Sequence, residues 1–219
     1  WVTGIVMSGS LADRGLGSLV NAGRPMMFEY LASVVLNQQP DELRRFALDA
    51  AVLPIMTEEA CNVVLGREDS KRLLSQLVRR ALFVTASEGT LRTYEFHPLF
   101  REFLLASLQG ADPKRIVDLR RRAANYHLAK GSLEQAVDLL IEAGSVRQAA
   151  KTAERHAREL FVGGRIQTIE RWVEIFRAEH AAVPNLTLAL VNSLRNRGDL
   201  SGAEGLLQEV ERAISPQSA

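Results

Sequence analysis

Glycine recurs at an almost constant interval in the C-terminal half of the chain, and this repeat limits the folds that the segment can adopt. Gly131, Gly164 and Gly198 stand 33 and 34 residues apart, and a stretch with helical spacing lies on each side of every one of them. Arrays of the tetratricopeptide (TPR) type have about 34 residues per helix–turn–helix repeat. One repeat cannot bury its apolar face alone, so neighbouring repeats stack and present a surface to ligands or partner chains. Residues 111–219 are therefore predicted to form a superhelical, TPR-like array of helix pairs.

The positions of apolar and small residues predict the limits of these helices. We expect six antiparallel helices, over 114–130, 133–143, 146–162, 166–179, 184–197 and 200–214, and no strand within 114–214. Ala136 and Ala149 are expected to be buried where two helices approach closely. The basic run 120–122 is interpreted as a solvated helix face.

Residues 28–110 have a different pattern. Apolar spacing predicts short helices over 27–36, 40–50, 58–65 and 71–80, with Thr57 and Ser70 as N-caps of the last two. Alternating residues over 82–85 and 91–96 surround a glycine-containing turn, which predicts a β-hairpin. A further helix follows Pro98. This order is that of a winged-helix domain, so the predicted fold class is mainly α: a winged-helix domain with one β-hairpin, followed by the α-superhelical array.

A winged-helix domain can bind DNA, and the helix over 71–80 carries Lys71, Arg72, Arg79 and Arg80. However, residues 28–110 contain nine basic and eleven acidic residues, and the turn at 88–90 has no basic side chain. The whole chain has a net charge of only +1. Because nucleic-acid binding requires a basic surface, we predict no direct nucleic-acid binding by this chain.

The motifs of common enzymes are absent from the sequence. No G-x-x-x-x-G-K-[ST] loop occurs, so no phosphate-binding Walker loop is present and the chain is not predicted to be an enzyme. The four histidines are far apart in the sequence and Cys61 is the only cysteine, so no metal site is predicted and a reducing, cytoplasmic location is expected. No apolar run reaches the roughly 20 residues of a membrane helix.

Several short strings in this order resemble the MalT-like group of LuxR-family bacterial transcription regulators, which are signal-transducing (STAND) ATPases. The strongest is Tyr94-Glu-Phe-His-Pro-Leu-Phe-Arg-Glu-Phe-Leu104, and weaker ones begin at Trp1, Phe28, Leu73 and Arg121. The resemblance implies three parts: 1–27 as the end of the ATPase helical module with a loop, 28–110 as the winged-helix domain, and 111–219 as the start of the sensor superhelix.

The resemblance also implies a function. The chain would be a regulatory, signal-relay fragment of an ATP-dependent transcription activator. Its partners would be the protein's own ATPase and DNA-binding domains and a small-molecule or protein effector. The parent protein would bind ATP or ADP with magnesium, and the fragment itself no cofactor. A free-standing TPR-like interaction scaffold and a winged-helix DNA-binding protein remain as alternatives.

His97 is the one candidate site residue. In related STAND proteins, a histidine in a His-x-Leu string of the winged-helix domain contacts the β-phosphate of ADP, and His97-Pro98-Leu99 is similar to that string. Pro98 departs from the acidic residue common there. The residues alone favour a packed or capping histidine at a strand–helix junction, and only the resemblance implies the phosphate contact. The phosphate-sensing role requires His97 to be at least partly exposed.

Overall fold

The computed structural model describes residues 35–87, 89 and 91–214. The segment 1–27 and all but the last two residues of the helix predicted over 27–36 lie outside this part of the chain. The chain divides into two compact units, one made of Trp1–Asn62 and Arg67–Ala111 and the other of Val63–Gly66 and Asp112–Ala219. Over the described residues the protein is mainly helical with a single β-hairpin, so the predicted fold class is confirmed.

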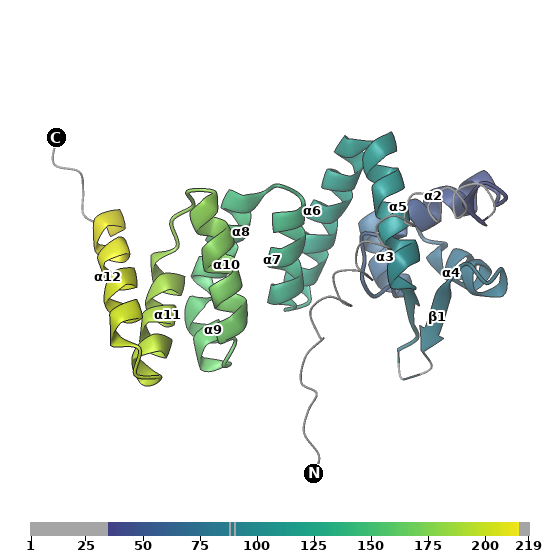
Figure 1. The fold of residues 1–219 in the computed structure, drawn as a ribbon. Helices are drawn as coiled ribbons and strands as arrows, with labels where there is room; N and C mark the ends of the chain where they lie inside the picture. The colour runs from purple at the N-terminus through teal and green to yellow at the C-terminus, as the bar shows by residue number, and fades with distance from the viewer. Residues whose placement is uncertain (1–34, 88, 90, 215–219) are drawn as a thin grey trace, which may run out of the picture. The chain divides into compact units, whose positions relative to one another are not determined.

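Four helices and the hairpin follow one another from residue 41 to residue 111 (Figure 1). They are α2 (Asp41–Ala50), α3 (Glu58–Leu65), α4 (Ser70–Arg79), β1 (Val84–Ser87), β2 (Thr93–Phe96) and α5 (Pro98–Ala111). The strands are antiparallel, with Val84 opposite Phe96 and Ser87 opposite Thr93. Met56, which precedes α3, pairs with Tyr94 of β2 through two backbone hydrogen bonds of 2.8 and 2.9 Å. The hairpin is thereby joined to the segment that precedes α3.

Most apolar positions of the predicted helices form the core of this part, whereas Val78 and Leu99 are half-buried. The buried side chains of α2, α4 and α5 include Leu43, Phe46, Leu73, Leu74, Leu77, Phe100, Phe103, Leu104 and Leu108. Ala81, which the helical spacing places inside, is exposed. Ala81 and Phe83 have left-handed backbone, with φ of 52° and 50°, so the chain turns sharply after α4 and the strand begins at Val84 instead of Leu82.

Of the two predicted N-caps, one is confirmed. The hydroxyl oxygen of Thr57 accepts the backbone N–H of Ala60 at 3.0 Å. Ser70 is instead the first residue of α4, and Asp69 occupies the N-cap position. The backbone N–H of Ser70 donates to the side-chain oxygen of Asn62 at 3.2 Å. A side chain from α3 therefore satisfies one of the free N–H groups at the start of α4.

The second unit contains seven helices among its described residues, where six were predicted. They are α6 (Pro113–Ala129), α7 (Leu133–Glu142), α8 (Val146–Arg155), α9 (Ala157–Val162), α10 (Ile166–Ala178), α11 (Pro184–Asn196) and α12 (Leu200–Ile214), and they follow one another along a row (Figure 1). The predicted helix 146–162 is broken at His156. The ring Nδ1 of His156 lies 2.9 Å from the carbonyl oxygen of Thr152, while its backbone N–H donates to Ala153. The imidazole of His156 thus contacts the carbonyl oxygen of Thr152 in place of the backbone N–H of His156, which a continuous α-helix would use.

The interpretation of the basic run 120–122 as a solvated helix face is wrong. Arg120 is half-buried and donates to the carbonyl oxygen of Glu142 at 2.8 Å. Arg121 donates to Ser145, and Arg122 donates to the carbonyl oxygen of Val63.

Two other predictions for this unit are confirmed. No strand occurs among the described residues of 114–214, and Ala136 and Ala149 are fully buried. Positive φ values mark the turns at Gly131, Gly144, Gly164 and Gly198, where glycine adopts left-handed backbone without a steric penalty. No helix within the described residues is both long and apolar enough to cross a membrane.

The turn after α10 is the exception to this use of glycine. His180 has a φ of 52°, and its N–H donates to Arg177 at 3.0 Å while that of Ala181 donates to Phe176 at 2.8 Å. These two bonds are the Schellman pattern in which glycine usually occupies the left-handed position. A residue with a Cβ at that position costs about 1 kcal/mol. The protein therefore carries backbone strain at this one turn of the array.

Polar links at the repeat interval join successive helix pairs. The carboxylate of Glu134 on α7 accepts from Thr168 at 3.1 Å and from Arg165 at 3.1 Å. Four residues further along α7, the carboxylate of Asp138 accepts from Arg171 at 2.9 Å and from the indole Nε1 of Trp172 at 2.8 Å. The partners stand 31 to 34 positions apart in the sequence. These bonds connect α7 to α10 at separations close to the interval of the glycine repeat.

His127 on α6 should make the stability of the chain depend on pH. Burial lowers the pKa of His127 from 6.5, and its Nε2 has no hydrogen-bond partner among the described residues. A base with a lower pKa in the folded than in the unfolded chain binds protons more readily when unfolded. We therefore expect full stability above the ordinary histidine pKa and a loss of stability as the pH falls through the lower, folded pKa. Urea unfolding of H127F between about pH 7 and pH 5 should lack this loss.

The exposed His97 provides the control for this prediction, because H97A removes an imidazole that stands on the surface. An acid-induced loss of stability in H127F equal to that of the parent protein would show that another group is responsible.

Candidate functional site

His97 lies between β2 and α5 with its side chain exposed, so the predicted exposure is confirmed. Its backbone N–H donates to the carbonyl oxygen of Phe83 at 2.7 Å, and its carbonyl oxygen accepts the N–H of Arg101 at 2.9 Å. The ring makes no hydrogen bond or ion pair with the residues that the structure describes. The backbone of His97 is therefore fixed at both ends, while the imidazole can reach a ligand.

Aromatic packing and one arginine hold the segment around His97. The ring of Phe100 lies 5.4 Å from that of Phe83 and 5.7 Å from that of Phe96. The guanidinium of Arg101 donates from Nε to the carbonyl oxygen of Ala51 at 2.8 Å, which joins α5 to the end of α2. These contacts connect three elements at the junction. They give the imidazole a defined starting position, as a binding residue requires.

The start of α5 suits an anion as well. Pro98 begins the helix, and the following N–H groups lack partners within it because they belong to the first turn. The N-terminal end of a helix carries partial positive charge and attracts phosphate groups. An imidazole can also donate a hydrogen bond to a phosphate oxygen. The residues present at His97 therefore fit a phosphate group, and the role itself stays a prediction.

The basic residues of α4, the candidate DNA-recognition helix, are partly engaged within the protein. Arg72 donates to Glu42 and to Asp69, each at 2.6 Å, and Arg80 donates to Gln39 at 3.2 Å. The hydrogen bonds from Arg72 and Arg67 also lower the pKa of the Asp69 carboxyl group. Lys71 and Arg79 are exposed. Two of the four basic side chains, Arg72 and Arg80, are thus bound to other groups of the protein. A DNA-binding helix would instead need them for contacts with DNA.

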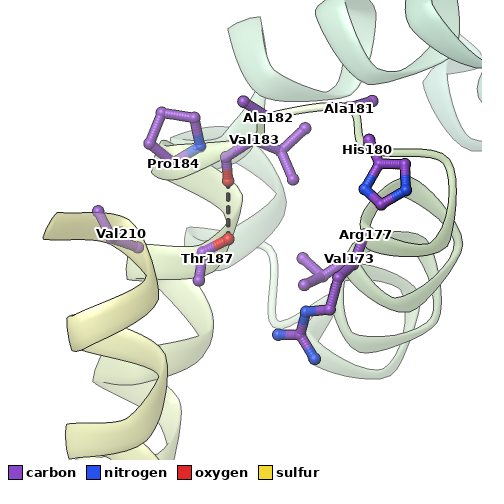
Figure 2. A pocket seen from close by; sticks show the side chains of 9 residues that line it. All are labelled: Val173, Arg177, His180, Ala181, Ala182, Val183, Pro184, Thr187 and Val210. Atoms are coloured by element: carbon purple, nitrogen blue, oxygen red, sulfur yellow. Dashed lines mark hydrogen bonds between the residues drawn. The ribbon is translucent and has the colours of Figure 1, made fainter. Parts of the chain in front are cut away.

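The helix array contains cavities that the sequence did not reveal. One of about 310 Å³ lies between α12 and the loop that follows α10, and Figure 2 shows its lining. Val210 borders it on one side, and Arg177 and His180 on the other. Between them, the hydroxyl of Thr187 donates to the carbonyl oxygen of Val183 at 2.9 Å.

A larger cavity of about 490 Å³ adjoins the same loop and shares His180, Ala181 and Ala182 with the first. Its remaining lining comes from α8, namely Arg147, Ala150, Lys151, Glu154 and Arg155. Two signals in the sequence could have indicated it: cations at intervals of four along one helix, and a non-glycine residue at a turn of the glycine repeat. Elsewhere, no three His, Cys, Asp or Glu side chains of the described residues lie close enough together to hold a metal ion.

The three-helix, hairpin and helix order around His97 defines a winged-helix module, and it is followed by an array of helix pairs. Residues 32–116 match the family described as the MalT winged helix domain. The resemblance to MalT-like regulators is therefore confirmed.

Three relatives place the module in larger proteins. The chain is 24% identical, over 98% of its length, to the HTH-type transcriptional regulator MalT of Cronobacter sakazakii, and 28% identical, over 66%, to that of Vibrio cholerae. It is also 28% identical, over 86% of its length, to the serine/threonine-protein kinase PknK of Mycobacterium tuberculosis. The chain spans 25%, 16% and 17% of the length of these relatives.

Proposed function

We propose that this chain is the signal-relay part of an ATP-dependent bacterial transcription activator, where it mediates contacts between domains and with an effector. The match of residues 32–116 to the MalT winged helix domain carries the proposal, together with the similarity of nearly the whole chain to transcriptional regulators. The 219 residues contain no Walker loop. Nucleotide hydrolysis and DNA reading would thus belong to other parts of such a cytoplasmic protein.

The kinase relative supports a relay role over a direct role in DNA binding. The matching segment occurs in a protein named as a transcriptional regulator and in one named as a protein kinase. A module shared by proteins with different outputs is better suited to transmit a signal than to perform either output. The engagement of Arg72 and Arg80 within the winged-helix unit also argues against DNA binding by α4.

His97 would link the winged-helix domain to the nucleotide. ADP supplies negative charge at its β-phosphate, and the exposed imidazole would donate a hydrogen bond to one of the phosphate oxygens. That bond would hold the resting arrangement of the domains. A free-standing TPR-like interaction scaffold is the second candidate, favoured by the helix-pair array itself. It predicts no nucleotide dependence.

The substitution H97A distinguishes these two functions. In a protein that carries this chain together with a Walker-type module, we expect H97A to weaken ADP binding by roughly 10- to 100-fold, because a charge-assisted hydrogen bond is lost. Basal activation of transcription should rise. Equilibrium dialysis with labelled ADP and a reporter assay measure the two effects.

Two further variants control this experiment. H97Q keeps a hydrogen-bond donor and should retain part of the affinity, whereas E95A alters an exposed neighbour on β2 and should leave it unchanged. Unaltered ADP affinity in H97A would reject the nucleotide-sensing role and favour the scaffold.

A further inference from the structure

We propose that the cavity between α8 and the loop at 180–182 binds a small phosphorylated molecule. Arg147, Lys151 and Arg155 line it from α8, and His180 lines it from the loop. Its volume of about 490 Å³ lies in the range of small-molecule sites. The inference rests on the proposed function in one respect, since this molecule would be the effector.

The cations of α8 lack acidic partners. Arg147, Lys151 and Arg155 follow one another at intervals of four, so they lie on the same face of the helix and repel one another. None of them forms an ion pair with the described residues, although Arg155 donates to the carbonyl oxygen of Lys151 at 3.3 Å. Elsewhere in the array, Arg165, Arg171 and Arg197 are all paired with carboxylates. The positive charge on α8 is therefore uncompensated within the described structure.

The one carboxylate in the lining is engaged elsewhere. Glu154 accepts the backbone N–H groups of Asn185 at 2.6 Å and of Leu186 at 3.1 Å, which caps the start of α11. Both oxygens thus point to a helix end instead of to the guanidinium groups. Three positive charges and one negative charge therefore line the cavity beside the imidazole of His180. A phosphoryl group carries a charge of about −1.5 to −2 at neutral pH and complements this excess.

His180 provides the second, independent observation. It is the only residue at a turn of the described array that adopts left-handed backbone with a side chain, where the other turns use glycine. Such strain is often found at binding sites, because the side chain is needed there. The strained residue contributes an imidazole to the lining of the cationic cavity. Replacement by glycine would relieve the backbone and remove the ring, so His180 is expected to be retained for ligand binding at the expense of stability.

The chemistry and shape favour phosphate over an acidic peptide. Two guanidinium groups offer paired donors that match phosphate oxygens, and lysine and imidazole add single donors. The groups come from two elements and border one cavity, which suits a compact ligand. Ala150, Ala181 and Ala182 leave room for its uncharged part. An extended acidic segment would instead require a cationic track that continues beyond the cavity.

Isothermal titration of the 219-residue chain with inorganic pyrophosphate tests the site. We expect saturable binding at one site with a dissociation constant below about 1 mM. K151A and R155A should each weaken it by about tenfold or more, as expected for the loss of a charge-assisted contact. R195A, which removes an exposed arginine of α11 outside the cavity, is the matched control and should leave binding unchanged. Circular dichroism verifies that each variant is folded.

His180 variants make the test sharper. H180G should raise the urea concentration at the midpoint of unfolding and weaken pyrophosphate binding by about threefold or more. A structural role alone would change stability without changing affinity. Absence of saturable binding, equal affinity in K151A, R155A and R195A, or unchanged affinity in H180G would overturn the proposal.

Two competing ligands complete the experiment. Citrate offers comparable charge on carboxylates, and a glutamate-rich peptide represents an acidic protein partner. Both should bind more weakly than pyrophosphate at matched ionic strength. Tighter binding of either would overturn the assignment to a phosphorylated molecule. The proposed relay function is tested separately at His97, so failure here would leave it standing.

Discussion

Replacement of Trp172 by alanine should lower the free energy of unfolding of the chain by about 3–5 kcal/mol, the usual cost of removing a large buried aromatic side chain. Trp172 on α10 is fully buried and is among the largest side chains in the core. Its indole N–H also donates to Asp138 on α7, so the substitution removes both packing and a link between neighbouring repeats. Urea unfolding followed by circular dichroism measures the change.

Two further substitutions separate packing from the polar link. D138A leaves the indole N–H without its partner and should cost about 1–3 kcal/mol. R171A removes only the ion pair of a half-exposed arginine and should cost less than about 1 kcal/mol. We expect the order W172A, D138A, R171A from the largest effect to the smallest. If R171A costs as much as D138A, the ion pair and not the indole bond connects the repeats.

The thiol of Cys61 should react roughly a thousandfold more slowly in the folded protein than in the unfolded chain, because the thiolate is the reactive form. Burial raises the pKa of Cys61 to about 12, although Arg67 nearby acts in the opposite direction. The side chain is fully buried in the winged-helix core. Reaction with a disulfide reagent at mildly alkaline pH, with and without urea, measures the ratio of rates.

Val63 offers a matched control on the same helix. It lies two residues beyond Cys61 on α3, and 55% of its surface is exposed. In a protein that also carries C61S, a cysteine introduced by V63C should react at nearly the rate of the unfolded chain. A native Cys61 that reacts as fast as this control would contradict the burial. Slow reaction would make the thiol a reporter of unfolding in this part of the molecule.

The repeat interval and the apolar periodicity were sufficient to predict most of the secondary structure. The turns at Gly131 and Gly198 and the hairpin before Pro98 depend on local chemistry, namely the left-handed freedom of glycine and the alternation of side chains in strands. These features are determined by residues close together in the sequence. The resemblance carried by the string from Tyr94 to Leu104 likewise depends on local sequence, and residues 32–116 match the MalT winged helix domain.

The departures from the predictions were decided by contacts between distant residues or by side-chain competition with the backbone. The break at His156 arises because its ring approaches the carbonyl oxygen of Thr152. Asn62, and not Ser70, caps the start of α4 because α3 brings its side chain there. A periodic pattern predicts which face of a helix is buried, but not which polar group will satisfy its ends.

The exposure of His97 was expected from the sequence, whereas the cavity beside α8 came only from the tertiary structure. The basic residues of α8 can be read from the sequence, and their spacing of four predicts that they lie on one face of the helix. Whether they are neutralised depends on where carboxylates from other helices lie. The fold directs Glu154 to the start of α11 and leaves Arg147 and Lys151 without acidic partners among the described residues. Whether charged side chains that are far apart in the sequence form ion pairs depends on packing, because only packing sets the distances between helices.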